Sequence, residues 1–171
     1  SDEKLIIDQN YFNENYHSEF LDQYSYYYAG MNTRPDGIKR KAFFTDVKVR
    51  RAMAYLVPVE EIIEVIVLGE GSRQVANLSN LKKNYNDTLN LIELNVDKGK
   101  QLLDEAGWID TDNDNIRDKI VNGEKLQMSF EFSYMSSATS KETALMIKES
   151  MWRAGVDVVP TPMDFTLFYK N

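Results

Sequence analysis

The chain has 171 residues, with 27 acidic against 20 basic side chains, one histidine and no cysteine. This length supports one domain with its own core, and a charged content of 27% is typical of a folded chain. The net charge of −7 argues against a nucleic-acid partner, because phosphate neutralisation needs a surplus of basic side chains. The lack of cysteine excludes a thiolate nucleophile and a cysteine-ligated zinc, and His17 alone cannot form a histidine-rich metal site.

Hydropathy argues against a membrane span in this segment. No stretch reaches the roughly 18 to 20 consecutive apolar residues that a spanning helix needs. The first residues, Ser-Asp-Glu-Lys, lack the basic and apolar regions of a signal peptide. A mature or excised segment would look the same, so these residues do not identify the cellular compartment.

The first distinctive element is a tyrosine-rich segment over residues 24–31, whose aromatic density predicts a strand. Alternation would place Tyr27 and Ala29 on one face of this strand and Tyr26 and Tyr28 on the other. One face must pack on the core, and the other either packs in a sheet or lines a binding cleft. Residues 32–40, which include proline and glycine, are expected to form a loop.

Two helices should follow this loop. Thr45 is the expected cap of the first, whose apolar stripe at i, i+3, i+4 and i+7 consists of Val49, Ala52, Met53 and Leu56. Pro58 should end this helix and start the next, over residues 60–68. Residues 69–94 have no sustained period and are predicted to be irregular.

A third helix is predicted over residues 96–106, capped by Asn95 and ended by Gly107. Gly99 lies inside this helix, where glycine costs about 1 kcal/mol relative to alanine. Packing must therefore offset that cost.

The last third of the chain predicts a strand, a helix and a second strand. Apolar and polar residues alternate over residues 126–134, and Thr139 with Glu142 suggests a capping box for a helix over 140–154. Residues 156–159 should return as a parallel strand through a right-handed crossover. Pro160 and Pro162 should stop that strand or place it at an edge. The fold class is α/β.

Several motifs in this order resemble one family. They are Tyr-Tyr-Tyr-Ala-Gly-Met-Asn (26–32), Phe-Thr-Asp-Val-Lys-Val-Arg-Arg-Ala-Met (44–53), Leu-Leu-Asp-Glu-Ala-Gly-Trp (102–108) and Ala-Gly-Val-Asp-Val (154–158). The chain resembles the extracellular solute-binding proteins of the oligopeptide/dipeptide class, which are the receptor subunits of ABC importers.

The resemblance implies a periplasmic-binding-protein-like (type II) fold, with a mixed sheet and flanking helices. Residues 1–171 would form one domain, part of the C-terminal lobe of a larger two-lobed receptor. The implied function is non-catalytic binding of a solute, a peptide or peptide-like molecule, by lobe closure. The implied partner is an ABC transporter permease, and the implied location is periplasmic or extracellular, with a lipoprotein anchor in the full-length chain. Tyr27, Ala29 and Asn32 are the candidate ligand-binding residues.

An aspartate-rich loop offers a second kind of site. Asp110, Asp112, Asp114, Ile116 and Asp118 occupy positions 1, 3, 5, 7 and 9 of a calcium-loop pattern. Asn115 replaces the usual glycine at position 6, and Val121 replaces the bidentate acid at position 12. The alternatives are a weak structural calcium site and a plain Asx-rich turn whose side chains bond their own backbone. No other cofactor is expected.

Two further functions compete with solute binding. Paired carboxylates, such as Asp104 with Glu105 and Glu60 with Glu61, could serve a hydrolase. All lie on predicted amphipathic helices, where carboxylates normally form a solvated face. A calcium-stabilised adhesion or scaffold domain would rest on the aspartate loop alone.

Overall fold

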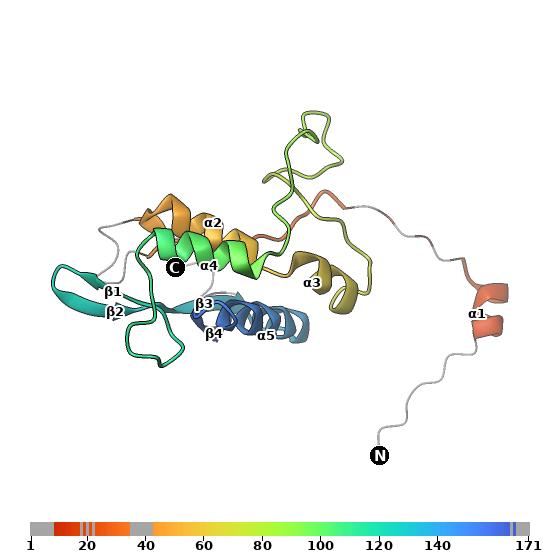
Figure 1. Cartoon of the computed structure of the whole chain (residues 1–171). Coiled ribbons are helices and arrows are strands. Elements are labelled where there is room, and N and C mark those ends of the chain that lie inside the picture. Colours follow the sequence, from red (N-terminus) through yellow and green to blue (C-terminus); the bar gives the residue numbers. More distant parts are fainter. Residues whose placement is uncertain are drawn as a thin grey trace, which may run out of the picture.

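The structure is a computed structural model that describes residues 9–17, 19, 21, 23–34, 43–164 and 166. Residues 35–40 of the predicted loop lie outside these residues. Figure 1 shows α1 apart from the other elements. In chain order the elements are α1 (Gln9–Asn15), a 3-10 turn η1 (Phe43–Thr45), α2 (Val47–Leu56), α3 (Val59–Val65), α4 (Val96–Glu105), β1 (Asp118–Val121), β2 (Glu124–Gln127), β3 (Ser129–Met135), α5 (Ala138–Trp152) and β4 (Asp157–Met163).

Helix α2 confirms the predicted apolar stripe, because all four of its residues are buried. Its cap is Asp46 and not Thr45: the Asp46 carboxylate accepts a hydrogen bond from the backbone N–H of Lys48 at 2.7 Å. Thr45 cannot cap α2 because it belongs to η1, one residue too early. Helix α3 begins directly after Pro58 and is shorter than predicted. Residues 69–94 contain neither helix nor strand, as expected.

Helix α4 packs against α2, and its predicted cap is confirmed. The Asn95 side chain accepts a hydrogen bond from the Lys98 N–H at 2.8 Å. Gly99 lies at the contact between the two helices, where a Cβ atom would be only 2.7 Å from Cδ2 of Leu56. Because Leu56 is fully buried, this close approach requires glycine. The gain in packing offsets the helix-propensity cost.

The strand predicted over 126–134 is confirmed except at Met128, where the chain changes partner and the strand divides in two. The backbone N–H of Met128 donates to the carbonyl of Arg117 at 2.7 Å, and its carbonyl accepts from the Asp157 N–H at 2.9 Å. Residues before this point form β2, which pairs antiparallel with β1, and residues after it form β3. Among the described residues, two separate two-stranded sheets therefore replace the expected single mixed sheet.

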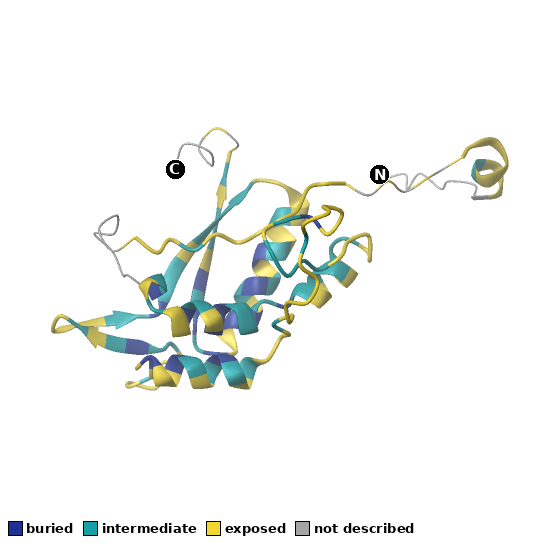
Figure 2. Ribbon diagram, turned by 90° about the horizontal axis from the view of Figure 1, so that it is seen from above, coloured by how far each residue is buried: buried dark blue, intermediate teal, exposed yellow. Residues whose placement is uncertain are grey.

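The predicted parallel pair is confirmed: β3 and β4 run parallel in register from Ser129 and Asp157, with α5 between them in sequence. Figure 2 shows α5 running alongside this pair. The predicted right-handedness of this crossover stays a prediction. The capping box at Thr139 is wrong, because Ser137 is the cap of α5 and accepts from the Ser140 N–H at 3.1 Å.

Strand β4 continues through Pro160 and Pro162 rather than stopping, and it lies at an edge, as the second alternative required. Asp157 and Met163 form their backbone hydrogen bonds toward β3 and the residues that flank it. Alternation along the strand then turns positions 158, 160 and 162 toward the open side. The two prolines therefore cost no hydrogen bond to β3, because an N–H group at either position would point away from it.

The predicted tyrosine strand is also wrong. Residues 24–34 form no ladder with any described strand. A strand needs a hydrogen-bonded neighbour, and aromatic density alone does not supply one. Met31 packs against the core, whereas Tyr27 is 98% exposed.

Arg117 joins the ends of two helices. Its Nε donates to the carbonyl of Ala154 at 2.7 Å, its Nη1 donates to the carbonyl of Trp108 at 2.6 Å, and it forms an ion pair with Asp104. The backbone N–H of Arg117 donates to the carbonyl of Gly155 at 2.8 Å. Only 12% of the Arg117 side chain is exposed.

The core lies between α2, α4, α5 and the β3–β4 pair. Its fully buried large side chains include Val49, Met53, Leu56, Leu103, Met128, Val156 and Val158. None of the described helices is long and apolar enough to cross a bilayer.

Gly99→Ala should destabilise the protein, although alanine favours helix. We expect a loss of about 1 to 3 kcal/mol in the free energy of unfolding, because the added methyl group would overlap the fully buried Leu56 side chain. Gly71→Ala is the matched control, since its Cβ would make ordinary contacts of 3.5 Å or more. Urea unfolding measures both, and a Gly99→Ala protein as stable as the parent would contradict this account of the helix contact.

Candidate functional site

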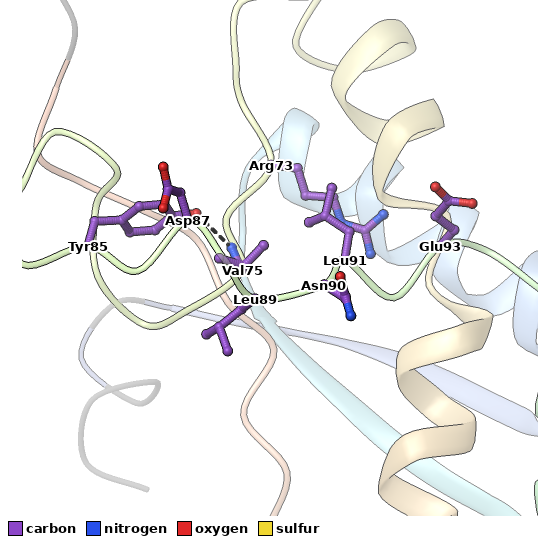
Figure 3. A pocket seen from close by; sticks show the side chains of 8 residues that line it. All are labelled: Arg73, Val75, Tyr85, Asp87, Leu89, Asn90, Leu91 and Glu93. Carbon is purple, nitrogen blue, oxygen red and sulfur yellow. Dashed lines mark hydrogen bonds between the residues drawn. The ribbon is translucent and has the colours of Figure 1, made fainter.

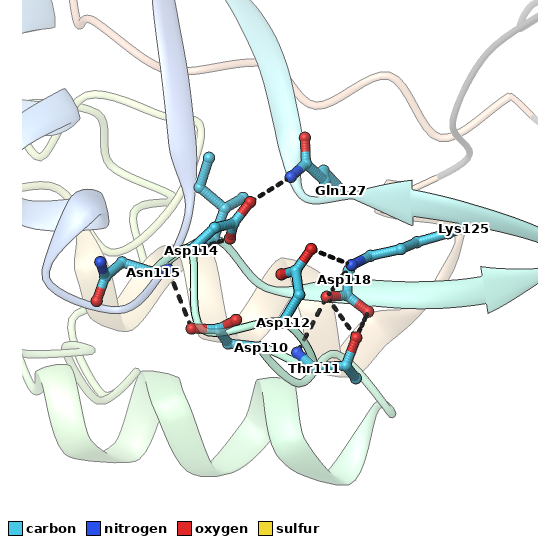
Figure 4. A network of polar contacts seen from close by, with 9 residues as sticks. Asp110, Thr111, Asp112, Asp114, Asn115, Asp118, Lys125 and Gln127 are labelled. Carbon is cyan, nitrogen blue, oxygen red and sulfur yellow. Dashed lines mark hydrogen bonds and ion pairs between the residues drawn. The ribbon is translucent and has the colours of Figure 1, made fainter.

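The loop between α4 and β1 brings three carboxylates together. Oxygen atoms of Asp110, Asp112 and Asp118 all lie within 4.8 Å of one another (Figure 4). Asp114 is not part of this group, because its Oδ2 accepts a hydrogen bond from Nε2 of Gln127 at 2.6 Å. The predicted convergence of alternate residues therefore holds for positions 1, 3 and 9 of the pattern.

The same loop contains Asx-type hydrogen bonds to its own backbone. Asp114 Oδ1 accepts from the Ile116 N–H at 2.8 Å, and Asp110 Oδ2 accepts from the Asn115 N–H at 3.0 Å. Asn115 has a φ of 70° and Asn113 a φ of 60°, so asparagine supplies the left-handed conformations that glycine would otherwise provide. These contacts are those of the structural turn that the sequence offered as an alternative.

Asp118 is the buried centre of the cluster, with 2% of its surface exposed. Burial alone would raise its pKa, but hydrogen bonds from the backbone N–H and the hydroxyl of Thr111, with the Lys125 ammonium, hold the pKa of Asp118 below its usual value. The Thr111 hydroxyl donates to Asp118 Oδ1 at 2.7 Å, and Lys125 Nζ lies 3.2 Å from Asp118 Oδ2.

Lys125 also lies 2.5 Å from Oδ2 of Asp112. The hydrogen bond to Asp112, opposed in part by burial and helped by Asp118, raises the pKa of Lys125. Its ammonium group therefore lies between two of the three carboxylates (Figure 4). Lys125 is a member of this site that the aspartate pattern does not predict. The Asn122-Gly123 pair could have indicated Lys125, because Asn-Gly favours a hairpin turn and the returning strand carries Lys125 back to the aspartate loop.

The candidate ligand-binding residues lie on the exposed tyrosine segment. Tyr27, Ala29 and Asn32 are all exposed, and Asn32 Oδ1 accepts a hydrogen bond from the Arg34 N–H at 3.1 Å. The rings of Tyr26 and Tyr28 lie 6.1 Å apart, as expected for alternate residues of an extended segment. These side chains are therefore open to solvent.

The irregular segment encloses an open depression of about 620 Å³ (Figure 3). Arg73 holds one side of it: Nη1 donates to Glu60 at 3.1 Å, and Nη2 donates to the carbonyl of Ile92. On the other side, the Tyr85 hydroxyl accepts from the Val75 N–H at 3.1 Å. Glu60 and Asp104, two of the carboxylates weighed for hydrolysis, are thus paired with arginines.

The family suggested by the sequence motifs also matches in comparisons with known proteins. The family model of bacterial extracellular solute-binding proteins, family 5 (middle), matches residues 3–171. The oligopeptide-binding protein AppA of Bacillus subtilis is 30% identical over 136 residues, which are 78% of this chain and 23% of that protein. The heme-binding protein A of Haemophilus influenzae is 40% identical over 68 residues, which are 40% of this chain and 12% of that protein.

Solved structures agree. AppA of Bacillus subtilis in complex with a nonapeptide matches with a TM-score of 0.69 and 28% identity, over 76% of this chain and 26% of that chain. The oligopeptide-binding protein of Thermus thermophilus, complexed with a pentapeptide, matches with a TM-score of 0.66 and 20% identity, over 73% of this chain and 21% of that chain. The second match shows the fold alone. The chain spans about a quarter of the AppA relative, at 23% of its length.

Calcium should leave the melting temperature unchanged at millimolar concentration. A metal ion would have to displace the Lys125 ammonium from Asp112 and Asp118, and Asx bonds already use other oxygens of the loop. Thermal unfolding with calcium and with a chelator measures this. A melting temperature that rises with calcium concentration would instead indicate the metal site, because a ligand that binds only the folded state must stabilise it.

Asp118 should make stability depend on acid pH. Its folded pKa is lowered, so its contribution is present above the unfolded pKa of about 4 and is lost as the pH falls through the folded value. Between about pH 6 and about pH 3, the parent should lose more melting temperature than Asp118→Asn. Asp87→Asn, at an exposed loop position, should behave like the parent. Equal losses in the parent and Asp118→Asn would refute this role.

Proposed function

The chain belongs to the bacterial extracellular solute-binding proteins, family 5, and from this membership we propose that it forms part of the peptide-binding lobe of an ABC transporter receptor. The observation that carries the proposal is the match to AppA in its nonapeptide complex, at 28% identity over 76% of this chain. At this identity the likeness extends beyond the fold to the sequence.

The proposed mechanism is binding by shape, without covalent chemistry. A two-lobed receptor encloses its solute by hinge closure, and residues 1–171 would be one domain within the C-terminal lobe. Exposed tyrosine rings support this role, since aromatic side chains offer a large contact area and a polar tip. Tyr27, Ala29 and Asn32 would contact the peptide from this lobe.

The same proposal covers the cellular setting. The receptor would act in the periplasm or outside the cell, held by a lipoprotein anchor, and would deliver its solute to a transporter permease. The extracellular solute-binding character of the family supports this setting. A hydrolase role has less support, because the carboxylates at Glu60 and Asp104 form ion pairs with arginines that support loops and helix ends.

Calorimetry with a mixture of nonapeptides tests the proposal. The full-length receptor should bind peptides, whereas residues 1–171 alone should not bind them tightly, because one lobe provides only one side of the enclosed site. Failure of the full-length receptor to bind any peptide would refute the peptide assignment. Submicromolar binding by residues 1–171 alone would refute the requirement for two lobes.

A further inference from the structure

Lys82 connects the irregular segment to the tyrosine segment. Its ammonium nitrogen lies 4.4 Å from the centroid of the Tyr24 ring. A cation at this distance over an aromatic face is attracted by the ring's negative π-surface. The contact therefore joins two parts of the chain that have no helix or strand of their own.

The backbone of Lys82 is held on both sides. Its N–H donates to the carbonyl of Ser79 at 2.9 Å, and its carbonyl accepts from the Tyr85 N–H at 2.9 Å. Ser79 is buried, with 3% of its surface exposed. Two successive turns thus fix Lys82, and Arg73 fixes the base of the segment on α3 through Glu60.

The tyrosine segment is held by a side-chain contact near each end. Met31 packs against the core at one end, and Tyr24 meets Lys82 at the other. Between these anchors lie Tyr27 and Ala29, both exposed. Because β-ladder bonds are absent from this described segment, side-chain contacts must limit its movement.

We propose that Lys82 is a positioning residue: through Tyr24 it holds in place the proposed solute-binding surface, which consists of Tyr27, Ala29 and Asn32. The inference rests on the proposed function, because the position of the segment matters to binding only if its residues meet the solute. The irregular segment thereby becomes a support for that surface rather than a passive connection.

The test uses the full-length receptor and the nonapeptide mixture, with two pairs of variants. Lys82→Met keeps much of the side-chain length and removes the charge, whereas Lys82→Arg keeps the charge. Tyr24→Leu removes the ring, whereas Tyr24→Phe keeps it. We expect Lys82→Met and Tyr24→Leu each to weaken the apparent peptide affinity about 2- to 5-fold, the range for an exposed cation–π contact. Both conservative variants should bind like the parent.

The double variant Lys82→Met/Tyr24→Leu separates positioning from general damage. It should bind no more weakly than either single variant, because both remove the same contact. Limited proteolysis should cleave residues 24–32 faster in Lys82→Met, with an unchanged melting temperature. Additive losses, parental affinity in both single variants, or a lowered melting temperature would overturn the proposal.

The two hypotheses fail in different ways. A parent receptor that binds no peptide refutes the proposed function, and the rate of proteolysis over residues 24–32 then decides whether Lys82 restrains the tyrosine segment. A parent that binds peptide while Lys82→Met binds equally well, with unchanged proteolysis over residues 24–32, refutes the role of Lys82 alone.

Discussion

The packing of this chain depends on one guanidinium group. Arg117 supplies hydrogen bonds to the carbonyls of Trp108 and Ala154, which follow α4 and α5, while its backbone binds Gly155 and Met128. Helix C-terminal ends carry partial negative charge, so a buried cation is well suited to them. An apolar side chain at this position would leave two partly buried carbonyls without these donors, which should destabilise the fold. Gly155 fits this arrangement because its φ is +75° and a Cβ would lie 3.0 Å from the Arg117 side chain.

Hydrophobic periodicity and capping preferences correctly predicted the elements that depend on contacts between residues close in sequence. The stripe of α2, the Asn95 cap of α4 and the parallel β3–β4 pair all depend on residues close in sequence or on a short crossover. Caps were displaced where two capping residues lie close together, as Thr45 and Asp46 do before α2 and Ser137 and Thr139 do at the start of α5. Propensity does not distinguish such neighbours, because the backbone path into the helix decides which side chain reaches a free N–H group.

Long-range contacts account for what the sequence did not predict. Alternation continues through Met128 without a break, yet its hydrogen bonds to Arg117 and Asp157 divide the strand in two. The aspartate pattern correctly grouped Asp110, Asp112 and Asp118, but the cation among them, Lys125, arrives through a hairpin. For the tyrosine segment, composition predicted a strand, and only the structure shows that its described neighbours are a lysine and the core edge.

The prolines of β4 limit which side of the parallel pair can form hydrogen bonds with another strand. Pro160 and Pro162 remove two successive donors from the outer side of β4, so an incoming strand would find carbonyls there without the alternating donors it needs. Edge-to-edge aggregation through this side is therefore disfavoured. The prolines therefore disfavour extension of the sheet beside β4, whereas β3 contains no proline.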